Sequence, residues 1–509
     1  MAIRTLQIDR REFVKGGAIA GLTAAYPGLF RDGPNGQKKP NILLIMSDEH
    51  NQRVSGCYGN SIVKTPNIDS LAAQGVVFEN HYCNSPLCVP SRSSFTAGKY
   101  ASRVDVWGLT SELPSNDMPS IARRMTAAGY EPYLCGKMHY QETRRYGFIQ
   151  TGGDFNNYPK SGRGKRDTPA DIKEHNPISG RFKQFKTGDH GGSVQHDRRV
   201  TAGAVDFLAK RDSEGPFFLL VGYLTPHFPL VVPEPFYTPY KDKVPMPDLP
   251  TKVVPNLPTN YKLQRTGFEE TDVPEPTVKF GRELYYGLTT WMDNEVGKVL
   301  AALRANPKIA DDTVIIYTTD HGENMAEHGL WWKNCMYDHA ARVPLVITWP
   351  KRWKGGQRRQ LVSGHLDLVK TVIDIAGGDT PSDWNGHSMV PWLDDANHKW
   401  KDTACSEYYA QFIAHGIVMF RTGKWKYVYH GKPAENMTVE RELFDMQADP
   451  HEFNNLADNP KYAKQIATLH QRMVEEVVGD PDVTEKRAVQ QLAAGYPGAP
   501  PDDGKDPGE

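Results

Sequence analysis

The sequence lacks an excess of either charge and lacks any apolar run of membrane-spanning length. Its 509 residues include 60 lysines and arginines and 61 aspartates and glutamates, a formal net charge of −1. A chain so balanced has no overall field that attracts nucleic acid or an anionic membrane, so any anion must be bound by a local cluster of residues. No later stretch approaches the roughly 18 apolar residues of a membrane helix, and we expect no membrane anchor.

Cysteine is also scarce. The six cysteines stand at positions 57, 83, 88, 135, 335 and 405. They are too few and too scattered for a disulfide framework, and although one bridge is compatible with the sequence, the spacings identify no pair. We therefore expect a core held by apolar packing, which a chain of this length that is 39% hydrophobic can build.

The amino terminus carries an export pattern. Arg10 and Arg11 precede Phe13, and a short run of small apolar residues follows as far as Ala25. This order is typical of a twin-arginine signal, and the run is too short and too rich in glycine to be an anchor. A frayed amphipathic terminus is the alternative. We predict that residues 1–37 are signal and linker and that the mature protein is periplasmic or secreted.

Four apolar runs have the continuous character of strands covered on both faces of a sheet. They span residues 41–47, 129–139, 216–225 and 313–319, and the second of them ends in Lys137 and His139. Helical patterns lie between them, at 65–75, 115–130 and 281–306. This alternation predicts an α/β fold with a mostly parallel sheet flanked by helices, in which ligands bind beyond the carboxyl ends of the strands.

The pattern changes near residue 400. Up to that point we predict one α/β domain, over residues 38–399. Beyond it, residues 416–430 alternate like an antiparallel strand pair and 460–479 are helical, so residues 400–482 are interpreted as a small α+β subdomain. Residues 483–509 have the composition of a disordered tail.

Two long segments, 153–193 and 229–276, are rich in glycine or proline. We interpret both as loops over the rim of the sheet, which is where substrate specificity resides in such folds. Trp107 and Trp331 are candidates for a wall of the binding site.

Two pairs of metal-ligand residues follow predicted strands. Asp48 and Glu49 end one run, and Asp320 and His321 end another. Carboxylates that outnumber a single imidazole suit a hard cation such as Ca²⁺, Mg²⁺ or Mn²⁺ better than zinc. One aspartate after a strand is more often a helix cap or a turn residue, but two such pairs favour a divalent-cation site.

Four further residues add positive charge and proton-transfer capacity: Lys137, His139, His227 and Lys333. Taken singly, each is more often a solvated or structural residue. Taken together, beside strand ends and a cation site, they predict a pocket for an oxyanion.

The stretch "CVPSR" places Cys88 two residues before Pro90 and four before Arg92. A catalytic thiolate would need a base and a lowered pKa. A zinc ligand would need a partner at C-x-x-C spacing, which Cys83 does not provide. A buried structural thiol is the commonest case. None of these alternatives explains the proline and the arginine.

The sequence resembles the type I sulfatases. "CVPSR" matches their C-x-P-S-R signature, and other stretches are similar to the family's motifs in the same order: "GYEPYLCGKMH", "TPHFP", "TTDHGE", "HGLWWK" and "ELFDMQADPHEFNNLA". In "SPLC", "SFTAG" and "GKMH" the chain is most similar to the choline-sulfatase and phosphonate-monoesterase branch. The resemblance covers residues 40 to about 470 and implies an alkaline-phosphatase-like α/β fold.

The resemblance implies that a dedicated maturation enzyme reads Pro90 and Arg92 and oxidises Cys88 to Cα-formylglycine, which Arg92 then holds in place. One hydroxyl of the hydrated aldehyde, bound to the cation, would attack sulfur, and the other would later expel sulfate. The implied cation ligands are Asp48, Glu49, the modified Cys88, Asp320 and His321. Lys137 and Lys333 would neutralise sulfate oxygens, His227 would assist the leaving alkoxide, and His139 would accept the proton of the second hydroxyl.

Two positions depart from the commonest family pattern. Glu49 and His321 stand where many members have Asp and Asn, so His321 is either a ligand or a proton donor beside the cation.

We predict a sulfuric ester hydrolase acting on extracellular sulfated carbohydrate. The alternatives are a phosphonate or phosphate ester hydrolase on the same scaffold and, if Cys88 stays unmodified, a non-catalytic sulfated-glycan-binding protein. The sequence does not predict the oligomeric state.

Overall fold

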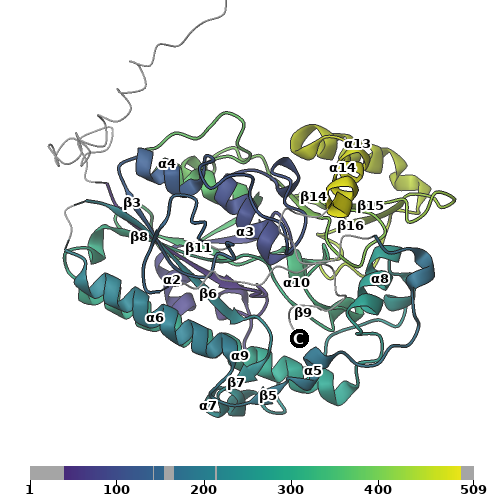
Figure 1. Ribbon diagram of the computed structural model, residues 1–509, viewed down its shortest axis with the longest axis horizontal. Helices are drawn as coiled ribbons and strands as arrows, with labels where there is room; N and C mark the ends of the chain where they lie inside the picture. Colours follow the sequence, from purple (N-terminus) through teal and green to yellow (C-terminus); the bar gives the residue numbers. More distant parts are fainter. Residues whose placement is uncertain (1–38, 142, 154–165, 213–214, 495–509) are drawn as a thin grey trace, which may run out of the picture.

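The computed structural model describes residues 39–141, 143–153, 166–212 and 215–494. The predicted signal lies outside these ranges. The centre of the molecule is an eight-stranded sheet with the order β12-β2-β11-β8-β1-β6-β3-β4 (Figure 1). Its strands are β1 (Asn41–Asp48), β2 (Val76–Tyr82), β3 (Glu131–Gly136), β4 (Ile149–Gln150), β6 (Phe217–Pro226), β8 (Thr313–Thr319), β11 (Leu345–Thr348) and β12 (Gln357–Gly364). Only β11 runs antiparallel to its neighbours within this sheet as described, so the predicted fold class is confirmed.

Helices cover both faces of the sheet. Strand β1 is fully buried, and its alternate side chains enter two separate clusters: Leu43 and Ile45 on one face, Ile42 and Leu44 on the other. The first cluster includes α2 (Pro66–Gln74), α6 (Gly192–Lys210) and α9 (Glu275–Ala305). The second includes α3 (Cys88–Ala97), α4 (Ile121–Ala127), α11 (His365–Ile375) and α12 (Val390–Asp394). The continuous apolar run of β1 is therefore what two-sided burial requires.

The carboxyl-terminal part of the chain forms a second, antiparallel sheet. Its strands are β13 (Thr403–Tyr408), β14 (Ile417–Thr422), β15 (Trp425–Gly431) and β16 (Glu440–Asp445). Helices α13 (Ala463–Met473) and α14 (Pro481–Ala494) lie beside these strands in Figure 1. The predicted strand pair and helix are present, whereas the division into domains near residue 400 stays a prediction.

The predicted disordered tail is wrong for its first part. Residues up to 494 belong to α14. Ala488 and Leu492 are buried in the apolar cluster of the second sheet, and this burial offsets the conformational entropy lost when the helix forms. Residues 495–509 lie outside the described ranges.

The two predicted rim segments contain short elements rather than loops alone. They hold α5 (Gly180–Lys183), β5 (Lys186–Thr187), β7 (Val231–Val232), α7 (Glu234–Tyr237) and α8 (Thr259–Gly267). The helix predicted over 115–130 is confined to α4, because Pro119 keeps the preceding residues out of the helical conformation. Between β8 and β11 the chain forms β9 (Asn324–Met325) and β10 (Trp331–Trp332), which pair with each other, and α10 (Asp338–Ala341).

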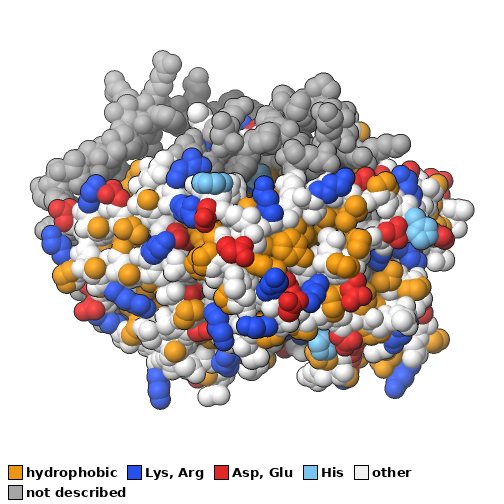
Figure 2. Space-filling view, turned by 90° about the horizontal axis from the view of Figure 1, so that it is seen from below, with side chains coloured by type: hydrophobic (Ala, Val, Ile, Leu, Met, Phe, Trp, Pro, Cys, Tyr) orange, Lys and Arg blue, Asp and Glu red, His pale blue; other side chains and the backbone are white. Residues whose placement is uncertain are grey.

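The surface matches the balanced composition. On the face shown in Figure 2, basic and acidic side chains are intermixed. Among the described helices, none combines the length and the apolar character needed to cross a bilayer. All six cysteines are free thiols.

Candidate active site

Four neighbouring strands deliver the predicted site residues to one edge of the main sheet. In the order β8-β1-β6-β3, these strands end at Asp320, Asp48, His227 and Lys137, or within one residue of them. The strands are parallel, so their carboxyl ends lie at the same edge. The site is therefore a product of the topology.

Cys88 lies against the predicted cation ligands. It is the first residue of α3, and its Sγ is 3.2 Å from His321 Nε2 and 3.6 Å from Asp48 Oδ1. One ligand atom from each of Asp48, Cys88, Asp320 and His321 falls within 4.8 Å of all the others, and all four residues are buried. The structure thus brings the thiol into one cluster with three of the four residues predicted from the strand ends as cation ligands; the fourth is Glu49.

Glu49 belongs to a second, overlapping group with Asp48 and His227. Its φ of 66° is left-handed, a conformation that a glutamate adopts only where neighbours impose it. Tyr285 of α9 supplies that restraint, because its hydroxyl donates to Glu49 O at 2.6 Å and accepts from Asn51 N at 2.8 Å. The carboxylate points to Lys333, whose Nζ is 3.0 Å from Glu49 Oε1.

Arg92 bridges the carboxylates at the ends of β1 and β8. Its guanidinium is completely buried and donates to Asp48 Oδ2 at 3.0 Å and to Asp320 Oδ2 at 2.7 Å. It also donates to Lys137 O at 2.8 Å. Burial alone would lower the pKa of Arg92, but the two aspartates raise it, so the charge is permanent.

Each of the two lysines lies beside a carboxylate of the site. Lys137 Nζ is 2.6 Å from Asp48 Oδ2. Burial by itself raises the pKa of Asp48, but Lys137, His227 and Arg92 hold it well below its usual value. For Lys333, burial lowers the pKa, and the nearby Cys88, Glu49 and Asp48 raise it above its ordinary value. Lys333 is therefore a cation beside Glu49.

His227 has a defined tautomer. Lys333 Nζ, which only donates, is 2.7 Å from His227 Nε2, so that nitrogen accepts. His227 Nδ1 must then carry the proton, which it donates to Phe228 O at 2.5 Å. Burial and the charge of Lys333 hold the pKa of His227 well below its usual range, so the ring is neutral.

His139 follows β3 with a left-handed φ of 58°. Burial and the charge of Lys137 lower its pKa well below the usual value, with smaller contributions from Arg92 and Lys333 and an opposing one from Asp48. This residue is therefore a second neutral imidazole within the electrostatic reach of the site.

The donor set fits a divalent cation. Burial alone would lower the pKa of His321, yet Asp320 and Cys88 raise it to about 9. A pocket that draws a proton onto a buried imidazole has a strongly negative potential, and a cation held there would take the place of that proton. Carboxylate oxygens with one imidazole suit a hard divalent ion.

Two sequence predictions are corrected at the site. Trp107 and Trp331 do not form an open wall, since their exposed fractions are 1% and 2%. Trp107 packs edge-on against Tyr409 of the second sheet's cluster, and Trp331 packs against Phe182. Large aromatic side chains are buried more often than they are displayed, and the sequence alone did not distinguish the two cases.

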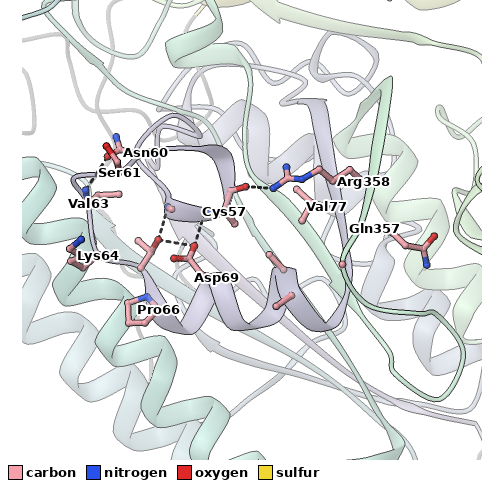
Figure 3. Close-up of a pocket in the computed structure, with 15 residues that line it drawn as sticks. Cys57, Asn60, Ser61, Val63, Lys64, Pro66, Asp69, Val77, Gln357 and Arg358 are labelled. Carbon is pink, nitrogen blue, oxygen red and sulfur yellow. Dashed lines mark hydrogen bonds between the residues drawn. The ribbon is translucent and has the colours of Figure 1, made fainter.

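A well-formed pocket lies elsewhere and contains none of the predicted site residues. It has a volume of about 760 Å³ beside α2 and the start of β12 (Figure 3). Its polar groups bond mainly to one another: Asp69 accepts from Cys57 N and from Thr65 Oγ1, and Arg358 donates to Cys57 O.

Fold and donor set together define an alkaline-phosphatase-like hydrolase. The family model described as "Sulfatase" matches residues 40–378, and one described as "N-sulphoglucosamine sulphohydrolase, C-terminal" matches residues 326–478. The chain belongs to the sulfatase family and is a sulfuric ester hydrolase.

Relatives agree with this assignment. The chain is 30% identical to a choline-sulfatase of Rhizobium meliloti, with 85% of each chain covered. It is 24% identical to an N-acetylglucosamine-6-O-sulfatase of Bacteroides thetaiotaomicron, with 89% of each covered. A phosphonate monoester hydrolase of Agrobacterium radiobacter has the same fold, with a TM-score of 0.68 and 21% identity over 86% of this chain and 95% of that one.

Proposed function

We propose that the protein hydrolyses sulfate esters of carbohydrates, with position 88 as the nucleophile after conversion of Cys88 to formylglycine. The observation that carries this proposal is the position of the Cys88 sulfur, 3.2 Å from His321 Nε2 and inside the cluster formed with Asp48 and Asp320. Apolar packing alone does not explain a thiol that lies among residues able to bind a cation.

The cation and the aldehyde would each supply one kind of chemistry. Asp48, Asp320, His321 and position 88 would hold the divalent ion, with Glu49 at its edge; a bound ion lowers the pKa of a coordinated hydroxyl and withdraws charge from the ester. The aldehyde, when hydrated, supplies a hydroxyl nucleophile. Ca²⁺ is the ion we favour because oxygen donors predominate.

The surrounding residues bind the ester and move protons. Lys137 and Lys333 would contact sulfate oxygens. Lys333 has three N–H donors, of which one goes to His227 Nε2, and its charge is paired with Glu49 Oε1 at 3.0 Å; a remaining N–H would reach the leaving oxygen. His139, held neutral, would accept a proton at position 88. Arg92 keeps both aspartates and the amino-terminal turn of α3 in register.

A carbohydrate substrate is supported by the B. thetaiotaomicron relative, which is an N-acetylglucosamine-6-O-sulfatase. The twin-arginine pattern of the amino terminus supports export to the periplasm or beyond, where sulfated polysaccharides are available, and a maturation enzyme would act on "CVPSR" before folding.

The test compares sulfate, phosphate and phosphonate esters of one phenol with the matured enzyme. We expect the highest kcat/KM for the sulfate ester. A preference for the phosphonate ester would support the second candidate, a phosphonate hydrolase, which the fold of the A. radiobacter enzyme favours. Binding of sulfated glycan without turnover would support a non-catalytic role.

A further inference from the structure

The end of β6, just before His227, departs from regular strand geometry. Strand β6 pairs with β1 through Gly222 opposite Met46, and next through Pro226 opposite Asp48. One residue of β1 therefore faces three residues of β6: Tyr223, Leu224 and Thr225. A bulge of this kind withdraws backbone groups from the ladder and turns the following residue in a new direction.

Asp197 of α6 binds the backbone groups of this bulge. Its side chain is completely buried, and its Oδ1 accepts from Leu224 N at 2.8 Å. Its Oδ2 accepts from Thr225 N at 2.7 Å and from Thr225 Oγ1 at 2.6 Å. The ring of His196 contacts Oδ1 as well, with Nδ1 at 2.6 Å. Bonds to a carboxylate are stronger than neutral ones, so one side chain fixes two consecutive peptide groups.

The restraint continues to His227 through a single turn. His227 N donates to Leu224 O at 3.1 Å. This oxygen belongs to the Leu224–Thr225 peptide, whose N–H donates to Asp197, so the peptide group held by Asp197 also anchors the backbone of His227. The imidazole then meets Lys333 at 2.7 Å. A chain of direct contacts therefore runs from α6 to the group that faces the leaving oxygen.

We propose that Asp197 is a positioning residue for hydrolysis: through the bulge at Leu224 and Thr225 it sets the place of His227 Nε2, and hence the direction of the Lys333 donor. The proposal rests on the proposed function for its kinetic consequence. Its structural content, the placement of His227 by a carboxylate on α6, is independent of that function.

The kinetic test uses Asp197→Asn and a series of aryl and alkyl sulfates with leaving groups of increasing pKa. Asparagine keeps the shape but replaces one accepting oxygen with a donor, so at least one of the two peptides loses its partner. We expect kcat to fall roughly 10- to 100-fold for alkyl sulfates and much less for 4-nitrophenyl sulfate, with KM little changed, because only poor leaving groups need the donor.

Two further variants separate positioning from general packing. Thr225→Val removes one donor to the same carboxylate and should give a weaker version of the same pattern. Thr201→Val is the matched control, because Thr201 is buried on the same helix and bonds to Tyr223 OH at 3.0 Å. It should lower stability without changing the dependence on the leaving group.

A crystal structure of Asp197→Asn provides a readout that does not depend on turnover. The proposal predicts a longer distance from His227 Nε2 to Lys333 Nζ than in the parent. An unchanged distance, or an equal loss of kcat for every leaving group, would overturn it. If the parent enzyme cleaves no sulfate ester, the proposed function fails, while the displacement of His227 still decides whether Asp197 positions it.

Discussion

Arg92 lies where the charges of the site meet. It stands four residues after Cys88 on α3, so the two side chains share one face of the helix. The sequence predicted that this arginine matters, through its place in "CVPSR". Its spacing from Cys88 could not show that the guanidinium would bridge Asp48 and Asp320. These two residues come from the ends of β1 and β8, which are distant from α3 in the sequence.

Replacing Arg92 by lysine tests this bridge. An ammonium group is a point charge and cannot span two carboxylates as a planar guanidinium does, so one buried aspartate would lose its contact with the cation at position 92. We expect kcat/KM, measured by steady-state kinetics and expressed per enzyme whose position 88 is converted to formylglycine, to fall by roughly 100-fold or more. Arg123→Lys, on the surface beside Asp117, is the control and should change nothing measurable. Unaltered kinetics in Arg92→Lys would contradict the assigned role.

The other site residues were predictable because of their position along the chain. Asp48, Asp320, Lys137 and His227 each follow an apolar run at or within one residue of the strand end, and parallel strands present their ends at one edge. Tyr285 and Asp197 were not predictable. Each lies inside a helix, and each acts on a backbone group whose irregular geometry the sequence does not reveal.

At the scale of elements, strands were predicted better than helices of mixed composition. The segment "CVPSRSSFTA" is rich in serine and contains proline, so its intrinsic helix propensity is low. It is a helix because all ten of its residues are buried between neighbouring elements, which outweighs propensity. Burial of this kind depends on contacts with distant segments and leaves no local signal.

Gly98 ends α3 and gives a prediction at this scale. It is left-handed, with φ 66°, and a Cβ there would lie 2.1 Å from the Trp384 ring. Gly98→Ala should lower the free energy of unfolding by about 2–4 kcal/mol, combining backbone strain with overpacking. Gly59→Ala is the matched control: its φ is 94° and no atom lies within 4 Å of its Cβ position, so only about 1 kcal/mol should be lost. Equal losses in urea unfolding would show that crowding at Trp384 is unimportant.

At the scale of the whole molecule, the second sheet is joined to the site by buried charges. Lys426 of β15 is fully buried, and its Nζ lies 2.5 Å from both Asp338 Oδ1 and Glu452 Oε1. It also donates to Met336 O at 3.0 Å, three residues beyond Lys333. Lys426 therefore joins the second sheet to α10 and to the segment that follows Lys333.

Lys426→Met should destabilise the protein by about 3–5 kcal/mol, because it leaves two buried carboxylates without their cation. A triple variant that also carries Asp338→Asn and Glu452→Gln should recover part of that loss in urea unfolding. Lys424→Met, half-exposed beside Asp445, should cost little. Failure of the triple variant to recover any stability would argue against an electrostatic origin.

The pH dependence of stability has a component at the same interface. Glu407 of β13 is buried and accepts from Ser102 N at 2.7 Å, and burial raises its pKa from 4.5 to about 7. The folded state therefore binds a proton that the unfolded state has lost, so this contribution is fully present below about pH 4.5 and disappears as the pH rises through about 7. We expect Glu407→Gln to reduce the loss of unfolding free energy between about pH 5 and pH 8 by on the order of 1–3 kcal/mol. An identical pH profile in both proteins would contradict this account.

The central claim is that position 88 reacts as an aldehyde seated among Asp48, Asp320 and His321. The most direct measurement is the mass of the peptide containing residue 88, taken from active enzyme produced together with a formylglycine-forming enzyme. The account predicts a mass lower than that of the thiol peptide by the difference between H₂S and O, and loss of turnover when a hydrazine labels that peptide. Fully active enzyme whose residue 88 is entirely unmodified cysteine would contradict it.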